Sequence, residues 1–316
     1  MINSKSRIFV AGHNGLVGSS VFKVLKENKY KNVLTVDRKK LDLEKKEKVE
    51  IFFKKKKPEF LVICAARAGG ILANSSYPTE FLINNLTIQN NLLTLAKKYE
   101  VKRTIFLGSS CIYPKLTKNP IKEEYLLTGK LEKTNEAYAV AKIAGLKLSE
   151  SLFKQYNQDI VCLMPTNVYG INDNFYNDNS HVIPGIISKI SKAKKNKKNV
   201  KLWGSGKPIR EFIFSDDLAS AILTILRQKK SKLVKVCNGN FPMLNVGSGH
   251  SLSIKHLSLK IKKILNYKGK IFFDTSKPDG TLKKNLDSSR IRKLAWKPKI
   301  SLEEGLEIII KSYQKI

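Results

Sequence analysis

Tyr138 and Lys142 lie four positions apart in the segment Tyr-Ala-Val-Ala-Lys. In a helix this spacing puts both side chains on one face. A phenol has an ordinary pKa of about 10, and a neighbouring ammonium group favours the phenolate and lowers that value. Such a pair can give or take a proton at a carbonyl group. Because the spacing alone is common on helix surfaces, the interpretation depends on the motifs around it.

The segment Gly108-Ser109-Ser110-Cys111 follows a stretch that reads as a strand, and ligands gather where parallel strands end. The Ser109 hydroxyl can donate to a substrate carbonyl whose oxygen gains charge. Cys111 is either a packed thiol or a base that removes a proton from carbon, since nearby positive charge turns a thiol into a useful base. His181 is the natural partner acid because imidazole titrates near neutrality, although a single histidine is often structural.

The turn Gly12-His13-Asn14-Gly15-Leu16-Val17-Gly18 follows the first apolar strand and precedes a helical pattern. Glycine suits a tight turn whose backbone N–H groups must approach a pyrophosphate closely. The helix that follows would point its positive end at the phosphates. The order strand, glycine turn, helix therefore predicts a dinucleotide site.

The next strand ends in Val36-Asp37-Arg38. An acid here bonds the ribose 2′-hydroxyl of NAD, whereas an arginine accommodates the 2′-phosphate of NADP. The chain offers both residues, and the two side chains could also be no more than exposed loop charges. These residues alone leave the choice of cofactor open.

The elements that must position these residues alternate between strand and helix through the first half of the chain, which predicts an α/β fold with a Rossmann-type, doubly wound parallel sheet. The expected strands are 7–11, 32–36, 60–65, 103–107 and 160–164, and the expected helices are 16–27, 45–55, 78–99 and 137–155. We expect a further helix over 218–227, with Ser215 or Asp216 as its N-cap. Residues 1–170, joined by about 203–228, are expected to form the nucleotide-binding domain. Residues 171–202 and 229–316 are expected to form a smaller substrate-binding region.

The composition restricts the class of protein. The net charge is +33, but lysines spread along the whole chain and their densest clusters, 54–57 and 189–201, lack interleaved aromatic residues. We therefore expect no nucleic-acid partner. The four cysteines and four histidines show no metal-ligand spacing, and no apolar run is long enough for a membrane helix. A cytoplasmic enzyme without a metal is the expectation.

Together the motifs resemble the GDP-L-fucose synthases, a family of the extended short-chain dehydrogenase/reductase superfamily, from about residue 7 to 310. The matching segments are GHNGLVG (12–18), CAARAGGI (64–71), LGSSCIYPK (107–115), YAVAKIAG (138–145), MPTNVYG (164–170), DNF (173–175), NSHVIP (179–184), WGSGKPIREF (203–212) and SKPDGT (276–281).

The resemblance implies NADPH-dependent conversion of GDP-4-keto-6-deoxy-D-mannose to GDP-L-fucose. Cys111 would be the base and His181 the acid of the epimerisation at C3 and C5, while Ser109, Tyr138 and Lys142 would serve the reduction at C4. The resemblance also implies that cofactor contacts come from the glycine turn, Arg38 and His181, and from Leu107, Gly108, Ser109, Ser110, Lys142, Pro165, Thr166, Asn167 and Val168. The GDP-sugar would be held by Lys189, Trp203, Arg210 and Asp279, and the chain would form a homodimer.

The chain departs from the family pattern at Asn14 and Lys189, where family members have arginine, and at Asp37, where they lack an acid. NAD therefore stays possible beside NADP. The alternative function is that of another nucleotide-sugar epimerase or dehydratase of the superfamily with tightly bound NAD.

Overall fold

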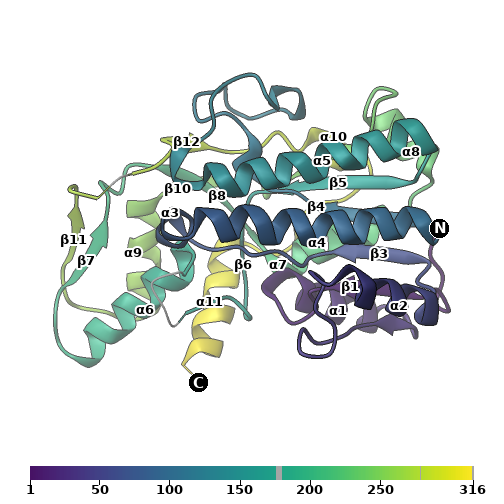
Figure 1. Cartoon of the computed structure of the whole chain (residues 1–316). Helices are drawn as coiled ribbons and strands as arrows, with labels where there is room; N and C mark the ends of the chain where they lie inside the picture. The colour runs from purple at the N-terminus through teal and green to yellow at the C-terminus, as the bar shows by residue number, and fades with distance from the viewer. Residues whose placement is uncertain (176–179, 278, 315–316) are drawn as a thin grey trace.

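The computed structural model describes residues 1–175, 180–277 and 279–314 (Figure 1). Asn179 and Pro278, which belong to two of the motifs above, lie outside this part of the chain. Within the described ranges, no helix combines the length and the apolar character needed to cross a membrane.

A six-stranded parallel sheet forms the centre of the larger unit, in the order β2-β1-β3-β4-β5-β9. The strands are β1 (Ile8–Ala11), β2 (Val33–Leu34), β3 (Phe60–Ile63), β4 (Arg103–Leu107), β5 (Ile160–Pro165) and β9 (Met243–Val246). The order reverses at β1, which pairs with β2 on one side and β3 on the other. The predicted α/β class with a doubly wound parallel sheet is confirmed.

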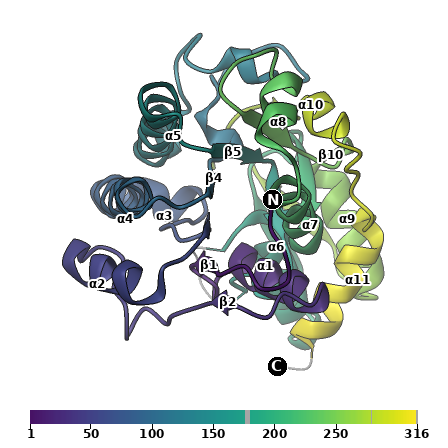
Figure 2. The same ribbon diagram turned by 90° about the vertical axis from the view of Figure 1, so that its right-hand side faces the viewer.

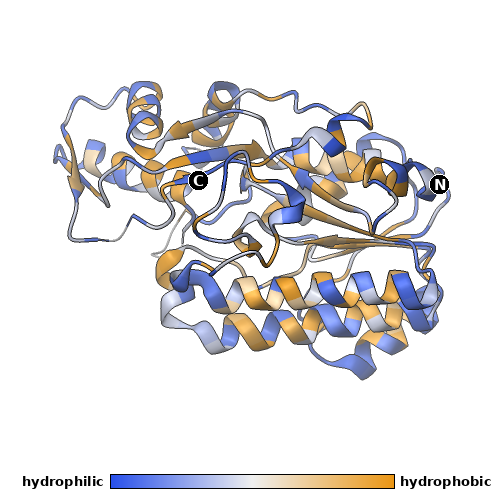
Figure 3. Ribbon diagram, turned by 90° about the horizontal axis from the view of Figure 1, so that it is seen from above, coloured by the Kyte–Doolittle hydropathy of each residue, from blue (hydrophilic) through white to orange (hydrophobic). Residues whose placement is uncertain are grey.

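Helices cover both faces of this sheet because its strands are apolar on both sides. On one face, Leu61 and Phe106 pack under α2 (Lys46–Lys56), α4 (Pro78–Lys98) and α5 (Glu136–Tyr156). On the other, Val62 and Ile105 pack under α1 (Leu16–Glu27), α7 (Ser215–Leu226), α8 (Lys230–Val236) and α10 (Ser289–Arg292). Figure 2 shows the two layers on either side of the strands, and in Figure 3 the central strands are largely apolar while the helices mix apolar and polar positions.

A smaller unit lies at the end of the molecule away from the N-terminus (Figure 1). Its strand β8 (Ile209–Phe214) pairs with β6 (Asn167–Tyr169), β10 (Ser251–Ser253) and β12 (Lys283–Lys284), while β7 (Val200–Trp203) pairs with β11 (Ile271–Asp274). The helices α6 (Val182–Lys195), α9 (Ile254–Ile264) and α11 (Leu302–Tyr313) share an apolar core with these strands.

Three features differ from the sequence-based expectation. Strand β9 and helix α8 come from the stretch 229–316 that was expected on the substrate side, yet they belong to the main sheet and its helix layer. Strand β8 was expected to return to the first domain but joins the smaller sheet. Helix α7 starts at Ser215 with Phe214 as its N-cap, because the Ser215 hydroxyl accepts a 2.7 Å hydrogen bond from Ser20 instead of capping the helix.

Candidate active site

The glycine turn between β1 and α1 forms a cradle that tolerates no side chain at two positions. Gly12 has φ +87°, and a Cβ there would lie 2.7 Å from the backbone of Ala65. A Cβ on Gly18 would lie 2.1 Å from the Gly12 carbonyl oxygen. Gly15 is the N-cap of α1, and no side chain occupies that cap. The turn thus leaves backbone N–H groups and the N-terminus of α1 available for a diphosphate. The other residues of the turn expected to contact the cofactor are His13, Asn14, Leu16 and Val17.

At the adenosine end of the expected cofactor site, Asp37 is held by the turn. Asn14 Nδ2 donates to Asp37 Oδ1 at 2.7 Å, and His13 Nε2 lies 3.6 Å from the same oxygen. The Arg38 side chain is 83% exposed and donates to Glu44 at 3.2 Å. An acid and an arginine therefore both stand where the ribose is expected.

Lys142 is buried behind the end of β4. Its Nζ donates to the Leu107 carbonyl oxygen at 2.8 Å and lies 5.9 Å from the centroid of the Tyr138 ring. Burial lowers the pKa of Lys142 to about 8. The side chain is thereby fixed beside Leu107 and Gly108, on the strand end that carries Ser109.

Tyr138 and Ser109 meet at the same strand end. Burial and, to a smaller extent, the electrostatic interaction with Cys111 raise the pKa of the Tyr138 hydroxyl, and the interaction with the Ser109 hydroxyl, which acts in the opposite direction, does not outweigh them. The pKa of Tyr138 is therefore raised well above its usual range, with burial as the main cause. The expectation that Lys142 lowers this pKa is wrong, because the ammonium group is directed to the Leu107 carbonyl and burial of the phenol dominates.

Cys111 lies on the short 3-10 helix η1 (Ser110–Ile112) that follows Ser109. Its backbone N–H donates to the Ser109 hydroxyl at 3.1 Å, which fixes the turn. Its sulfur accepts a hydrogen bond from Asn135 Nδ2 at 3.3 Å. The thiol is half-buried and close enough to act electrostatically on both Tyr138 and Arg210. It is therefore not enclosed in the core.

His181 is the N-cap residue of α6, and its Nδ1 lies 3.0 Å from Asp173 Oδ1. Burial lowers the pKa of the imidazole, but the hydrogen bond and the charge of Asp173 together outweigh burial and raise it. Asp173 also lines a cleft of about 620 Å³ that includes His13 and Asn14 of the glycine turn. His181 is thus tied to a segment that borders the cofactor site.

The segment after β5 connects the cofactor side to the substrate side. Thr166 Oγ1 and Asn167 Nδ2 both donate to the Glu211 carbonyl oxygen, at 3.0 and 2.8 Å. Pro165 and Val168 flank these two residues at the carboxyl end of β5. Arg210 therefore sits on a strand that is fastened directly to the expected cofactor segment.

The residues expected to hold the GDP-sugar gather around β8 and the loop before β12. The Asp279 carboxylate accepts from the backbone N–H and the hydroxyl of Ser205, at 2.6 and 2.7 Å, and it acts electrostatically on Arg210. Trp203 is 48% exposed, and the ammonium group of Lys189 lies 5.1 Å from its ring centroid. Lys189 thus pairs with an exposed indole ring, and Arg210 lies within electrostatic range of both Asp279 and Cys111.

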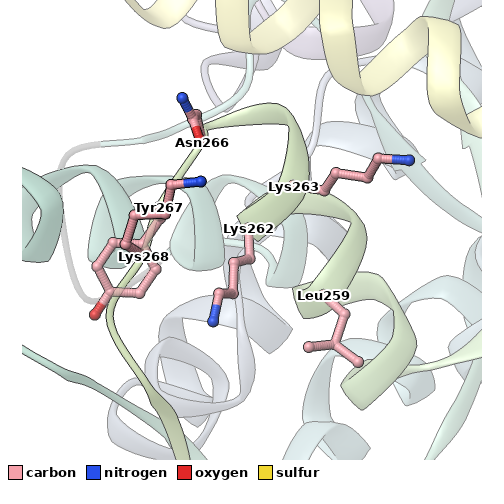
Figure 4. Close-up of a pocket in the computed structure, with 6 residues that line it drawn as sticks. All are labelled: Leu259, Lys262, Lys263, Asn266, Tyr267 and Lys268. Atoms are coloured by element: carbon pink, nitrogen blue, oxygen red, sulfur yellow. The ribbon is translucent and has the colours of Figure 1, made fainter.

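A separate pocket at the end of α9 has no comparable chemistry. Figure 4 shows its lining residues, Leu259, Lys262, Lys263, Asn266, Tyr267 and Lys268. Lys262 Nζ donates to the Gly269 carbonyl oxygen and the Tyr267 hydroxyl donates to that of Lys198, so both side chains hold the local chain.

Sequence reasoning missed two partners in the site. Asn135 precedes Tyr138 by three positions, so the helical spacing that links Tyr138 to Lys142 could have indicated it. Asp173 lies in the segment DNF, which was recognised only as part of the resemblance. Its pairing with His181 has no signal in residue spacing.

A parallel sheet with a glycine turn after its first strand, a serine at the end of β4 and a tyrosine and a lysine on helix α5 defines an oxidoreductase-like enzyme of the extended short-chain type. The chain belongs to the NAD dependent epimerase/dehydratase family, whose model matches residues 8–238.

Similar proteins share nearly the whole length of the chain. A putative GDP-L-fucose synthase 2 of Arabidopsis thaliana is 45% identical over 97% of this chain and 91% of its own. The GDP-L-fucose synthase of Escherichia coli is 43% identical over 96% of this chain and 95% of its own. The solved structure of a GDP-mannoheptose C4 reductase from Campylobacter jejuni with NADP bound has a TM-score of 0.89 and 34% identity, covering 99% of this chain and 100% of that one.

Proposed function

We propose that the protein converts GDP-4-keto-6-deoxy-D-mannose to GDP-L-fucose. The observation that carries the proposal is the meeting of Ser109, Cys111 and Tyr138 at the carboxyl end of β4, with Lys142 bonded to the Leu107 carbonyl and Arg210 within electrostatic range of Cys111. A proton-transfer set and a cation for the diphosphate thus border one site. The similarity to the GDP-L-fucose synthases supports the choice of sugar.

The protein is an NADP-dependent nucleotide-sugar enzyme. Its glycine turn fits a dinucleotide, since Gly12 and Gly18 allow the turn to pack directly against Ala65 and the start of α1, where a Cβ would collide with backbone atoms. When bound, NADPH supplies the hydride for reduction of a ketone. Arg38 is the residue of this chain that suits the 2′-phosphate of NADPH. Asp37 suits the free 2′-hydroxyl of NADH, so the proposal includes some use of NADH.

Epimerisation at C3 and C5 needs a base on one face of the sugar and an acid on the other. Both carbons flank the C4 ketone, so the electron pair left by each departing proton is stabilised as an enolate. Cys111 takes the proton from carbon, and His181, held by Asp173, gives a proton to the opposite face. Each epimerisation protonates the thiolate and deprotonates the imidazolium, so both groups must exchange protons with solvent before the next one.

Two hydroxyl groups act on the ketone oxygen of the substrate. Ser109 donates to it while it carries negative charge, and Tyr138 delivers a proton to it when the C4 alcohol forms. The raised pKa of Tyr138 keeps its proton in place until that step. Lys142, fixed on the Leu107 carbonyl, would orient the cofactor ribose.

The GDP end of the substrate would lie along the smaller unit. The Arg210 guanidinium suits a diphosphate as a two-pronged donor, and Lys189 suits it as a point charge. Trp203 offers an exposed ring for the guanosine or the sugar. Asp279 holds the Ser205 turn beside them.

A homodimer formed through α4 and α5 fits the exposed apolar side chains Ile83 and Val140 on these helices. A cytoplasmic location stays a prediction.

The direct test mixes the purified protein with NADPH and GDP-4-keto-6-deoxy-D-mannose and follows the loss of nicotinamide absorbance, with the product identified by mass spectrometry and NMR. We expect turnover to GDP-L-fucose. Absence of turnover, or net isomerisation without consumption of NADPH, would instead favour an epimerase or dehydratase of the same family.

A further inference from the structure

The Asn135 side-chain amide contacts the sulfur of Cys111. Its Nδ2 lies 3.3 Å from Cys111 Sγ. Its Oδ1 is buried and has no hydrogen-bond partner among the residues that the structure describes. A buried amide oxygen is normally hydrogen-bonded, so its orientation in this site calls for an explanation.

The backbone places Asn135 in the reaction site. It ends the 3-10 helix η3 (Lys133–Asn135) and is the N-cap position of α5, three residues before Tyr138 and seven before Lys142. These three side chains therefore follow one face of the helix. Opposite them, the bond from the Cys111 N–H to Ser109 Oγ holds the sulfur within reach of the amide.

We propose that Asn135 is a positioning residue that serves Cys111 in both of its protonation states. As a thiolate, the sulfur accepts from Nδ2. As a thiol, it can donate its proton to Oδ1 after a half-turn of the amide about the Cβ–Cγ bond. No hydrogen bond from the described part of the chain to Oδ1 opposes this rotation. The inference rests on the proposed function of Cys111 as base.

The proton balance explains why a neutral amide suits this position. The proton leaves a sugar carbon for the sulfur, the C–H electron pair enters the enolate, and the S–H proton then passes to solvent, so nothing is oxidised or reduced. A fixed cation in contact with the sulfur would favour only the thiolate and oppose its protonation. Arg210 already supplies positive charge to the site. The Asn135 amide adds a hydrogen-bond partner for the sulfur that can rotate with each proton transfer.

The test measures the rate of alkylation of the protein by iodoacetamide as a function of pH, with Cys111→Ser as the blank for the other three cysteines. Asn135→Ala should move the pH midpoint upward by about one unit, a tenfold loss of thiolate at a given pH, because a donor to a charged acceptor is lost. Asn135→Asp, which places a carboxylate at the sulfur, should move it further upward. The matched control is Thr134→Val, which removes a neighbouring buried hydroxyl that also lacks a hydrogen-bond partner in the described chain, and it should leave the midpoint in place.

Melting temperature and NADPH affinity show whether each variant is folded. A folded Asn135→Ala protein with an unchanged alkylation midpoint would overturn the proposal, as would an equal shift in Thr134→Val. This outcome is separate from failure of the proposed function. If the wild-type protein does not convert the GDP-sugar, the function fails whatever the alkylation shows, whereas normal turnover with an unmoved midpoint removes only the role of Asn135.

Discussion

At the scale of single residues, Cys111 and His181 are held in different ways. Cys111 sits on η1, whose turn is closed by Ser109, and its sulfur contacts Asn135. His181 depends on one ion pair, because Asp173 is the group that raises its pKa against the effect of burial. The proposed base is therefore fixed by local backbone and the proposed acid by a charged side chain.

Asp173→Asn tests this dependence. The raised pKa keeps His181 in its proton-donating form to higher pH, and loss of the carboxylate charge should lower that pKa. The pH at which solvent exchange at C3 and C5 declines on the alkaline side should then move downward, with a loss of about tenfold near pH 8. The control Asp216→Asn removes another carboxylate, the partner of Lys23, and should leave the profile unchanged. A profile in Asp173→Asn that matches the wild type would contradict the role of the ion pair.

The candidate catalytic residues could be predicted from the sequence where their chemical type coincides with a characteristic spacing. Tyr138, Lys142, Ser109 and Cys111 were found from helical spacing and from their place after a strand, and the structure brings them together. The raised pKa of Tyr138 was not predicted, since it follows from burial that only the folded chain defines. The partner of His181 was missed for the same reason.

At the scale of elements, the close contact of the glycine turn with α1 is the tightest constraint on the cofactor site. Gly18→Ala would force its Cβ into the Gly12 carbonyl and displace the start of the helix. We expect a loss of about 1–3 kcal/mol of unfolding free energy and at least tenfold weaker NADPH binding, measured by chemical denaturation and by titration.

Gly15→Ala is the matched control for stability. Its Cβ would lie 3.5 Å from the nearest atom outside the adjoining residues, an ordinary contact, and its φ of −80° suits alanine. This variant should lose only about 1 kcal/mol or less, the cost of alanine at an N-cap, and so less than Gly18→Ala. Equal stability losses in both variants would show that the close approach at Gly18 is not the constraint.

The sequence predicts elements best where local pattern decides them. Helix α1 and strand β4 begin and end where the pattern placed them, because apolar periodicity and flanking turn residues are local. Strand β2 is shorter than expected. The place of β9 depends on pairing with β5, from which three strands and three helices separate it along the chain. The start of α7 is in contact with Ser20, which lies in α1 and is far away in the sequence. Neither long-range contact is encoded in a short window.

At the scale of the whole molecule, the net charge of +33 should favour the approach of an anionic GDP-sugar. We expect kcat/KM to fall several-fold as salt rises from about 20 to 500 mM, through KM more than kcat, since screening weakens attraction over distance. Steady-state kinetics at constant pH would measure this. A kcat/KM that does not change with salt would show that the positive charge plays no part in substrate capture.

The larger and the smaller unit of the fold are joined by hydrogen bonds next to the candidate site. The side chains of Thr166 and Asn167 bond the backbone of Glu211, and the Glu211 carboxylate accepts from the N–H groups of Gly249 and Leu286. The expected cofactor segment and the strand of Arg210 are thereby fixed to each other. The sequence-based division of the chain into a nucleotide-binding and a substrate-binding range did not reveal this connection, because it depends on the buried residue Glu211.

The central claim is that Cys111 and His181 exchange protons at two carbons of a ketosugar that is then reduced. The most direct measurement is the number of deuterium atoms in the product after complete turnover with unlabelled NADPH in D2O. We predict two carbon-bound deuterons, at C3 and C5, for the wild-type protein. In Cys111→Ser we predict incorporation slowed at least about a hundredfold with unchanged NADPH affinity. A reduced wild-type product without deuterium at these carbons, or normal incorporation in Cys111→Ser, would contradict the account.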